Sequence, residues 1–255
     1  MSEDTQVVPA TQPSHNLAIP EEIKSLLAVA AKESIQNESK GLQVISLKGK
    51  RFSAGDIKLG TELAVVVLAD TYDNAWYDAP YKEDVINAPA CFAIGTDEAM
   101  LAPHATSPKP QSEDCESCDK NAFGSSSNGK GKACRNGRRL LVAPFTDGDV
   151  DLANTALISL APTSLKGYSK HKRVTASLYN LPVFAIGTRL SFDDDKAYPV
   201  LEFAYISNVT NSDTITKIME NRSAYQAAVQ LPYNVEQYKD AGTPADNAGT
   251  KSKLS

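Results

Sequence analysis

The sequence predicts an α+β fold: a small OB-like β-barrel with a long zinc-stabilised loop insertion and a few short helices. Apolar residues alternate with period two through much of residues 42–95, 138–162 and 182–207, which is typical of β-strands. Many strands with few helices indicate an α+β barrel. Residues 96–139 have almost no apolar periodicity, and a loop of this length inside a compact domain requires something other than a core to order it.

The N-terminal half begins with polar residues and then alternates between strands and glycine turns. Residues 1–19 are polar and read as a disordered arm. A helix is expected from Pro20, because proline and two glutamates suit a first helical turn. Strands are expected at 42–49, 51–59, 62–78 and 90–95, with Gly49, Gly55 and Gly60 as turns.

The C-terminal half carries the remaining strands and two further helices. Strands are predicted at 138–145 and 156–162, a hairpin at 182–207, and a capped amphipathic helix at 211–229. A short helix is expected at 163–180, with Thr163 or Ser164 as N-cap and with Leu165, Tyr168 and Val174 on its apolar side. The predicted organisation is a disordered arm (1–19), a single OB-like domain (20–235) with a zinc-binding insertion (91–139), and a flexible tail (236–255).

Composition restricts the classes of function. The 255 residues carry a net charge of −5, so a role in nucleic-acid binding must depend on local basic patches. No apolar run approaches the roughly 18–20 residues needed to span a membrane, and the N-terminus lacks the pattern of a secretory signal. We therefore expect a cytoplasmic protein, without a membrane partner, whose thiols stay reduced.

Four cysteines form the most specific pattern in the chain. Cys91, Cys115, Cys118 and Cys134 follow the spacing C-x23-C-x2-C-x15-C. The pair three positions apart forms a tight knuckle, and two ligands from the edges of the loop complete a tetrahedron around Zn²⁺. His104, in the same loop, is an alternative fourth ligand to Cys91. Zinc binding would supply the ordering free energy that the composition of this loop does not.

Other interpretations of the thiols stay open. The first is a redox CxxC pair, which the acidic residues next to these cysteines disfavour. The other two are an iron–sulfur cluster and thiols that bind no metal. A catalytic zinc is disfavoured, since no glutamate stands two residues after His104 and no proline precedes Cys115. No hydrolase, metalloprotease or nuclease motif is present, so we do not expect an enzyme.

Two basic runs and several aromatic residues indicate nucleic-acid binding. The candidates for phosphate contacts are Lys130, Lys132, Arg135, Arg138, Arg139, Lys170, Lys172 and Arg173. Trp76, Tyr77 and Tyr168 are candidates for stacking on bases. Aromatic rings among cations are what a protein that binds a single strand needs, although each ring could equally belong to the core.

Several motifs resemble those of a group of phage-encoded proteins of unassigned or replication-related function. These motifs are the blocks at Asn74–Tyr81, Pro89–Phe92, Cys115–Ser125 and Gly129–Leu140. More loosely, a zinc subdomain on a small β-barrel is similar to the T4-type phage single-stranded DNA-binding proteins. That resemblance implies an OB-fold and one histidine with three cysteines as zinc ligands, here His104, Cys115, Cys118 and Cys134; Cys91 stands outside that pattern.

The sequence thus predicts a non-enzymatic single-stranded DNA-binding protein of phage replication or recombination, located in the cytoplasm of the bacterial host. Phage replication or recombination proteins are its expected protein partners. An alternative is a zinc-stabilised protein-interaction module of a phage replication or transcription complex. A regulator that binds duplex DNA or RNA ranks lower, because no recognition helix with a basic face is visible in the sequence.

Overall fold

The computed structural model describes residues 42–79 and 88–233. The predicted N-terminal arm, the helix from Pro20, the end of the aromatic block at Tyr81 and the C-terminal tail lie outside the described residues. No helix among the described residues is long and apolar enough to cross a membrane.

The described residues form one mixed sheet with three α-helices, which confirms the α+β class. The strands are β1 (Gln43–Ser46), β2 (Phe52–Ala54), β3 (Ile57–Gly60), β4 (Leu63–Trp76), β5 (Cys91–Gly95), β6 (Arg135–Thr146), β7 (Asp149–Val150), β8 (Ala156–Leu160), β9 (Ile186–Phe192) and β10 (Leu201–Asn208). The helices are α2 (Pro162–Tyr179), α3 (Ser212–Glu220) and α4 (Arg222–Val229), with short 3-10 helices η1 (Lys48–Lys50), η2 (Glu98–Met100), η3 (Asp119–Asn121) and η4 (Val183–Ala185).

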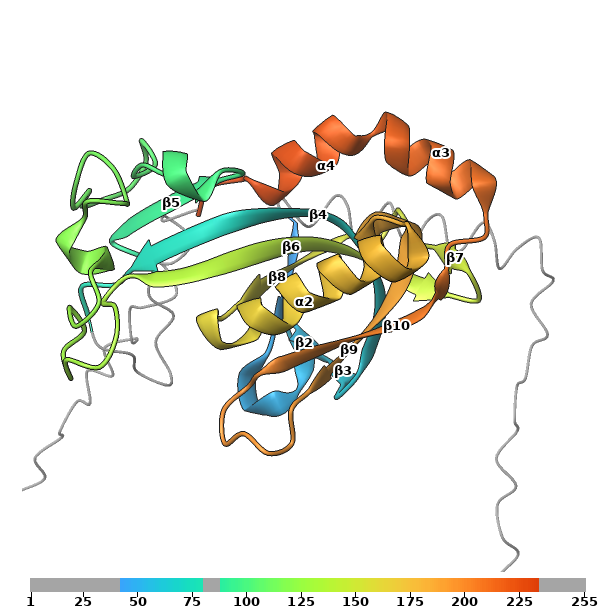
Figure 1. Ribbon diagram of the computed structural model, residues 1–255, viewed down its shortest axis with the longest axis horizontal. Coiled ribbons are helices and arrows are strands. Elements are labelled where there is room, and N and C mark those ends of the chain that lie inside the picture. The colour runs from blue at the N-terminus through green and yellow to red at the C-terminus, as the bar shows by residue number, and fades with distance from the viewer. Residues whose placement is uncertain (1–41, 80–87, 234–255) are drawn as a thin grey trace, which may run out of the picture. The chain divides into compact units, whose positions relative to one another are not determined.

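The sheet curls into a half-barrel (Figure 1). Its strand order is β10-β9-β4-β6-β8-β1-β2-β3, and all pairs are antiparallel except β1 with β8. The curl brings Phe52 of β2 against Phe192 of β9, with ring centroids 4.6 Å apart. Lys50 donates to the backbone oxygens of Asp193 and Asp194 at 2.9 and 3.2 Å. This strand path is open within the described chain, so a barrel-like sheet is seen, whereas OB-type closure stays a prediction.

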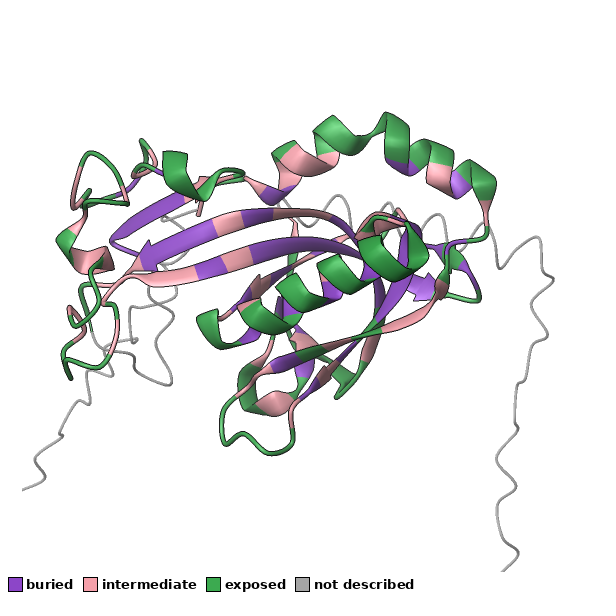
Figure 2. Ribbon diagram, in the orientation of Figure 1, coloured by how far each residue is buried: buried purple, intermediate pink, exposed green. Residues whose placement is uncertain are grey.

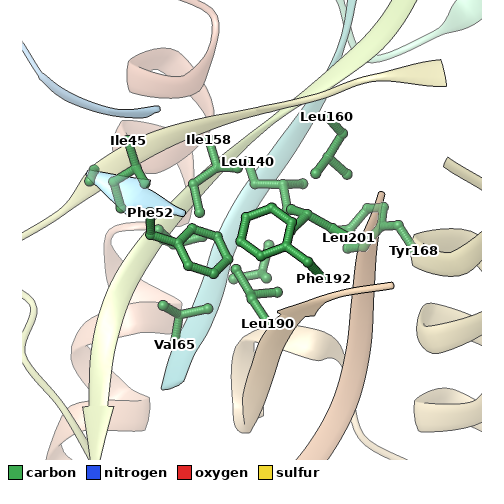
Figure 3. Close-up of a cluster of buried hydrophobic side chains, with 13 residues drawn as sticks. Ile45, Phe52, Val65, Leu140, Ile158, Leu160, Tyr168, Leu190, Phe192 and Leu201 are labelled. Atoms are coloured by element: carbon green, nitrogen blue, oxygen red, sulfur yellow. The ribbon is translucent and has the colours of Figure 1, made fainter. Parts of the chain in front are cut away.

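Two apolar cores lie on opposite faces of the sheet. The core inside the curl includes Phe52, Leu140 and Phe192, and α2 covers it with Tyr168 (Figure 3). The core on the outer face is covered by α3 and α4, which contribute Ile218 and Val229. Alternation along β4 and β6 supplies both cores, because successive side chains of a strand point to opposite faces.

Strands β4 and β6 extend beyond the half-barrel as a long ribbon (Figure 1). They pair from Val65 with Pro144 to Ala75 with Arg135, with a bulge between Val67 and Ala69. β5 joins the far end of β4, where Trp76 pairs with Cys91. The segment 96–134, drawn in green, therefore lies at the far end of this ribbon.

The helices differ from the sequence predictions in three respects. α2 begins at Pro162 after Ala161 without a side-chain cap, so the expected caps Thr163 and Ser164 are wrong; proline at the first turn already suits a helix start. Val174 is exposed and does not belong to the apolar side. The expected helix at 211–229 is two helices that meet at Asn221, although its predicted start is confirmed by the Asn211 cap.

Gly137 of β6 occupies a position where no side chain fits. A Cβ atom there would lie 2.6 Å from the Leu160 carbonyl oxygen and 3.2 Å from that of Asp73, both of them backbone atoms. Gly137→Ala is therefore expected to lower the free energy of unfolding by about 1–3 kcal/mol, as overpacking does, measured by urea denaturation.

Gly167→Ala is the matched control for this substitution. Gly167 lies in α2, and its Cβ would meet the nearest atom, the Leu201 oxygen, at an ordinary 3.5 Å. Alanine is about 0.8–1.0 kcal/mol better than glycine in a helix, so this variant is expected to be neutral or more stable. Equal stability of the two variants would contradict the close strand packing at Gly137.

A thiol cavity and two ion clusters as the candidate site

Four thiols line one small cavity at the far end of the β4–β6 ribbon. The cavity has a volume of about 20 Å³, room for about one water molecule or ion, and all four cysteines contribute to its wall: Cys91, Cys115, Cys118 and Cys134. Three structural elements bring them together. Cys91 begins β5, Cys118 directly precedes η3, and Cys134 directly precedes β6. All four are free thiols. The predicted grouping of the cysteines is therefore present in the fold.

Backbone hydrogen bonds fix the register of the loop around the cavity. Cys115 N donates to the Leu101 oxygen at 2.9 Å, and Cys134 N donates to the Lys120 oxygen at 2.7 Å. Asn121 Nδ2 donates to the Cys115 oxygen at 2.6 Å. Apolar burial contributes little, since Leu101 is the one fully buried apolar side chain within 96–134, a segment that the structure describes completely. One buried leucine supplies about 1.5–3 kcal/mol, the ordering cost of only a few residues.

The thiols perturb one another electrostatically. Burial, together with the neighbouring thiolate charges, raises the pKa of Cys134 to about 12 and that of Cys115 to about 11. Burial also raises the pKa of Cys91. Four thiolates therefore do not coexist in this cavity at neutral pH without a compensating cation. No group of three or more His, Cys, Asp or Glu side chains among the described residues has the spacing of a completed metal site.

His104 lies outside the thiol cavity. Its ring stacks on Phe92, with centroids 5.2 Å apart and an interplanar angle of 16°. Its Nδ1 is 2.9 Å from the Thr106 hydroxyl. Since Cys91 lines the cavity and His104 does not, the structure favours the four-cysteine set over the alternative with His104.

The arginines after Cys134 are held by internal ion pairs with β4. Arg138 pairs with Asp70 and lies over the ring of Tyr72, with its guanidinium carbon 3.9 Å from the ring centroid. Arg139, on the other face of the ribbon, lies 3.4 Å from Asp73. Residues three apart on a strand point to opposite faces, so these two aspartates neutralise arginines on both sides of the ribbon.

Asp73 is the centre of a buried polar cluster. Its carboxylate accepts hydrogen bonds from the Tyr233 hydroxyl at 2.8 and 3.0 Å, and Arg135 approaches it at 3.5 Å. Arg139 also donates to the Leu231 backbone oxygen at 2.5 Å, which fastens the segment after α4 to the ribbon. Burial alone would lower the pKa of Arg139, but the charge of Asp73 and the interactions with Tyr233 together outweigh burial and raise that pKa.

Asp73→Asn is expected to lower the free energy of unfolding by about 3–5 kcal/mol. The buried Arg139 would then lie in a desolvated site without its carboxylate, which is the costly way to break a buried pair, and the partly exposed Arg135 would lose the same partner. Urea denaturation followed by the fluorescence of Trp76 measures the change. Asp195→Asn, on the exposed hairpin between β9 and β10, is the control and should change stability by less than about 0.5 kcal/mol. A loss below 1 kcal/mol in Asp73→Asn would contradict a structural role for the cluster.

Three residues predicted to contact nucleic acid are ion-paired or buried in the structure, so these predictions are wrong. Arg139 is buried, Arg138 is largely buried against Asp70, and neither is free for a phosphate. Tyr168 is completely buried beneath α2, so its ring is a core residue and not a stacking surface. The sequence offered one missed indication: Asp70 and Asp73 are the two charged residues in the interior of a long predicted strand, and buried carboxylates require cationic partners.

The other candidates differ in their surroundings. Lys130 and Lys132 are exposed, and Lys132 donates to Asn121 Oδ1 at 3.1 Å. Arg135 is partly exposed beside Asp73, and Tyr77 is half-buried just after β4. Trp76 is half-buried in the wall of the thiol cavity, with Lys120 Nζ 5.2 Å from its ring centroid.

The second basic run lies on α2, where Lys172 binds Asp70 at 3.0 Å. Lys170 and Arg173 are exposed on the outer face of this helix. The structure therefore separates the predicted basic residues into two sites: the loop around the thiols and the outer face of α2.

No protein-family model matches this chain, and neither curated proteins nor solved structures show a significant similarity to it. The functional argument therefore rests on the geometry of the described residues.

Proposed function

We propose that this chain is a non-enzymatic single-stranded DNA-binding protein with a structural zinc, and that the outer face of α2 supplies its main phosphate contacts. The observation that carries the proposal is the charge of this helix. Residues 162–180 contain four Lys or Arg and no Asp or Glu. By contrast, the segment 96–134 contains six acidic residues and four lysines, so it attracts phosphate less.

Three cations of α2 form one stripe on its outer face. Lys166, Lys170 and Arg173 are spaced i, i+4 and i+7, which places them along one side of a helix. All three are exposed and have no acidic partner within the described part of the chain. Figure 2 shows that much of α2 is exposed. Cations without internal partners need not break an ion pair when they bind a phosphate. This stripe replaces Arg138 and Arg139 as the principal phosphate site.

Small side chains border the stripe and permit close approach. Ser169 and Ser177 are exposed beside the cations. Hydroxyl groups donate to phosphate oxygens, as in many protein–DNA interfaces. A sugar–phosphate backbone can therefore lie along α2 without meeting an acidic side chain of this helix.

Exposed rings near the end of α2 support a preference for single strands. Tyr179 stacks on Tyr205 of β10, with centroids 4.2 Å apart at 13°, and Tyr179 is 40% exposed. Unpaired bases can stack on such a pair, whereas the bases of a duplex are not accessible to it. Trp76 and Tyr77 stay as predicted stacking residues on the ribbon.

Zinc fits the donor set of the thiol cavity. Four cysteines line one small cavity, and four cysteine ligands without an open position are the donor set of many structural zinc sites. The ligands would be Cys91, Cys115, Cys118 and Cys134. Bound zinc would offset the mutual repulsion of the thiolates and hold 96–134 in place at the end of the ribbon.

The cellular setting follows from the same proposal. A curled sheet with a zinc-stabilised insertion suits the OB-like architecture expected for a phage replication or recombination protein. Four free thiols suit the reducing cytoplasm of a bacterial host.

Titration of a fluorescently labelled single-stranded oligonucleotide tests the function. Anisotropy at low salt should show micromolar or tighter binding that weakens steeply as salt increases. Duplex DNA and RNA of the same sequence serve as competitors, and weaker competition by the duplex is expected. Absence of binding to the single strand at low salt would refute the proposal.

A second candidate function is a zinc-stabilised protein-interaction module. Two apolar side chains of the insertion favour it, because Phe123 is 84% exposed and Met100 is 79% exposed. In that case Phe123→Ser would abolish capture of a phage replication protein, while substitutions in α2 would leave capture unchanged.

A further inference from the structure

The geometry points to a base-binding hollow beside α2, which receives one base of the strand whose phosphates lie on the α2 stripe; this inference rests on the proposed function. The hollow lies between β4, α2, η4 and α4 and has a volume of about 480 Å³. This volume falls within the range of about 300–1,000 Å³ that is typical of small-molecule sites.

The floor of the hollow is an unpaired stretch of strand edge. On one edge of β4, the pairing with β9 ends at Val65, and the pairing with β5 begins at Tyr72. No described strand covers the edge between them, although Gln226 of α4 donates to the Asp70 backbone oxygen at 3.3 Å. On the opposite edge of the same stretch, the pairing with β6 has a bulge between Val67 and Ala69. Strand edges present backbone donors and acceptors, which can hydrogen-bond to the edge of a base.

The rim of the hollow is positively charged. Asp70 lies in the wall and is paired with both Arg138 and Lys172, so two cations share one carboxylate. Arg222 adds a further positive charge to the rim and has no acidic partner within the described residues. This distribution favours a ligand that carries phosphate.

On one side, the wall of the hollow contains an aromatic ring of η4. On the other side, the wall is formed by α2, which carries the phosphate-binding stripe. The guanidinium carbon of Arg222 lies 4.8 Å from the ring centroid of Phe184. Because Phe184 packs against the outer-face core and Arg222 lies over its ring, a base would stack on the guanidinium of Arg222. Ala176 and Lys172 of α2 line the other side, one helical turn or less from Arg173. A strand held by the stripe thus has a base within reach of the hollow.

Ala176→Trp tests the inference, because it fills the hollow and leaves every charge in place. Ala176 is exposed on α2, so the larger side chain projects into the hollow without displacing the core. Leu178→Trp is the control, since Leu178 is 73% exposed and is not part of the wall of the hollow. Thermal denaturation confirms that both variants fold.

The probes are a labelled thymidine oligonucleotide and the same backbone with every base removed. The unmodified protein should prefer the thymidine strand about tenfold, a magnitude typical of base stacking. Ala176→Trp should reduce its affinity for the thymidine strand to that for the abasic strand, whereas Leu178→Trp should keep the preference. If Ala176→Trp keeps the preference, the hollow does not bind a base, while the α2 phosphate site still stands. If the unmodified protein binds neither strand, the proposed function itself is wrong.

Discussion

Protein purified without chelator is expected to contain about one zinc ion per chain, and Cys115→Ser or Cys118→Ser is expected to remove it. Both thiols line the cavity with Cys91 and Cys134, and loss of one ligand from a four-thiolate set leaves the ion exposed to competition. Apparent binding free energies of structural zinc are about 10–16 kcal/mol, so the effect on the insertion should be large. Elemental analysis of the purified variants measures the loss directly.

The consequence should be confined to the insertion. Neither apolar core contains a residue of 96–134, so the half-barrel is expected to stay folded without metal. Limited proteolysis should then cleave the metal-depleted protein within 96–134 and spare the sheet. Cooperative unfolding of the whole chain on chelation would show that the insertion also supports the core.

His104→Ala is the control variant for the metal site. His104 stacks on Phe92 outside the cavity, so this variant should keep its zinc. Loss of zinc in His104→Ala but not in Cys91→Ser would show that the ligands are one histidine and three cysteines. Iron with acid-labile sulfide would instead identify an iron–sulfur cluster, and absence of both metals would end the metal proposal.

Replacement of Lys170 and Arg173 by glutamate is expected to weaken binding to a single-stranded oligonucleotide by about a hundredfold at 50 mM salt. Each lost phosphate contact on a single strand removes about 0.7 from the slope of log affinity against log salt, so two contacts remove about 1.4. Extrapolated from 1 M to 50 mM salt, that change in slope gives a loss of nearly two orders of magnitude. Both side chains are exposed, so the fold should not change.

Lys130→Glu with Lys132→Glu is the matched control, because it changes the net charge by the same amount at the other basic site. These lysines lie among the acidic residues of the insertion, and a much smaller loss is expected. Anisotropy titrations over a series of salt concentrations provide both the affinity and the slope. A larger loss in the insertion variant would place the phosphate site around the thiols, where the sequence alone predicted it.

The strands could be predicted from the sequence because their apolar alternation is local. The pattern 62–78 gave β4 almost to the residue, and Gly55 lies in a turn as predicted. Gly60 is instead the last residue of β3, and Gly49 lies in η1. The break at Asn221 was missed, since an uninterrupted amphipathic pattern does not reveal a change of helix direction. The curl of the sheet depends on contacts such as Phe52 with Phe192, which are 140 residues apart in the chain.

The pairing of the basic residues could not be predicted from neighbouring residues in the sequence. Arg135, Arg138 and Arg139 look like one basic cluster in the sequence, yet strand alternation sends them to two faces, toward Asp70 and Asp73. Their partners lie more than 60 residues earlier, so a count of nearby charges could not reveal the neutralisation. Only the register of β4 with β6 brings these charges together.

By itself, the sequence determined the α+β class and most of the strands, because apolar periodicity is a property of short segments. The tertiary structure decided which cations are free. An arginine that is buried beside an aspartate stabilises the fold and does not bind a phosphate. Lys166, Lys170 and Arg173 are exposed on a helix without acidic residues, and we propose that they bind phosphates. The two groups of cations differ in desolvation and in ion pairing. Both depend on neighbours that are close in the fold but distant in the sequence.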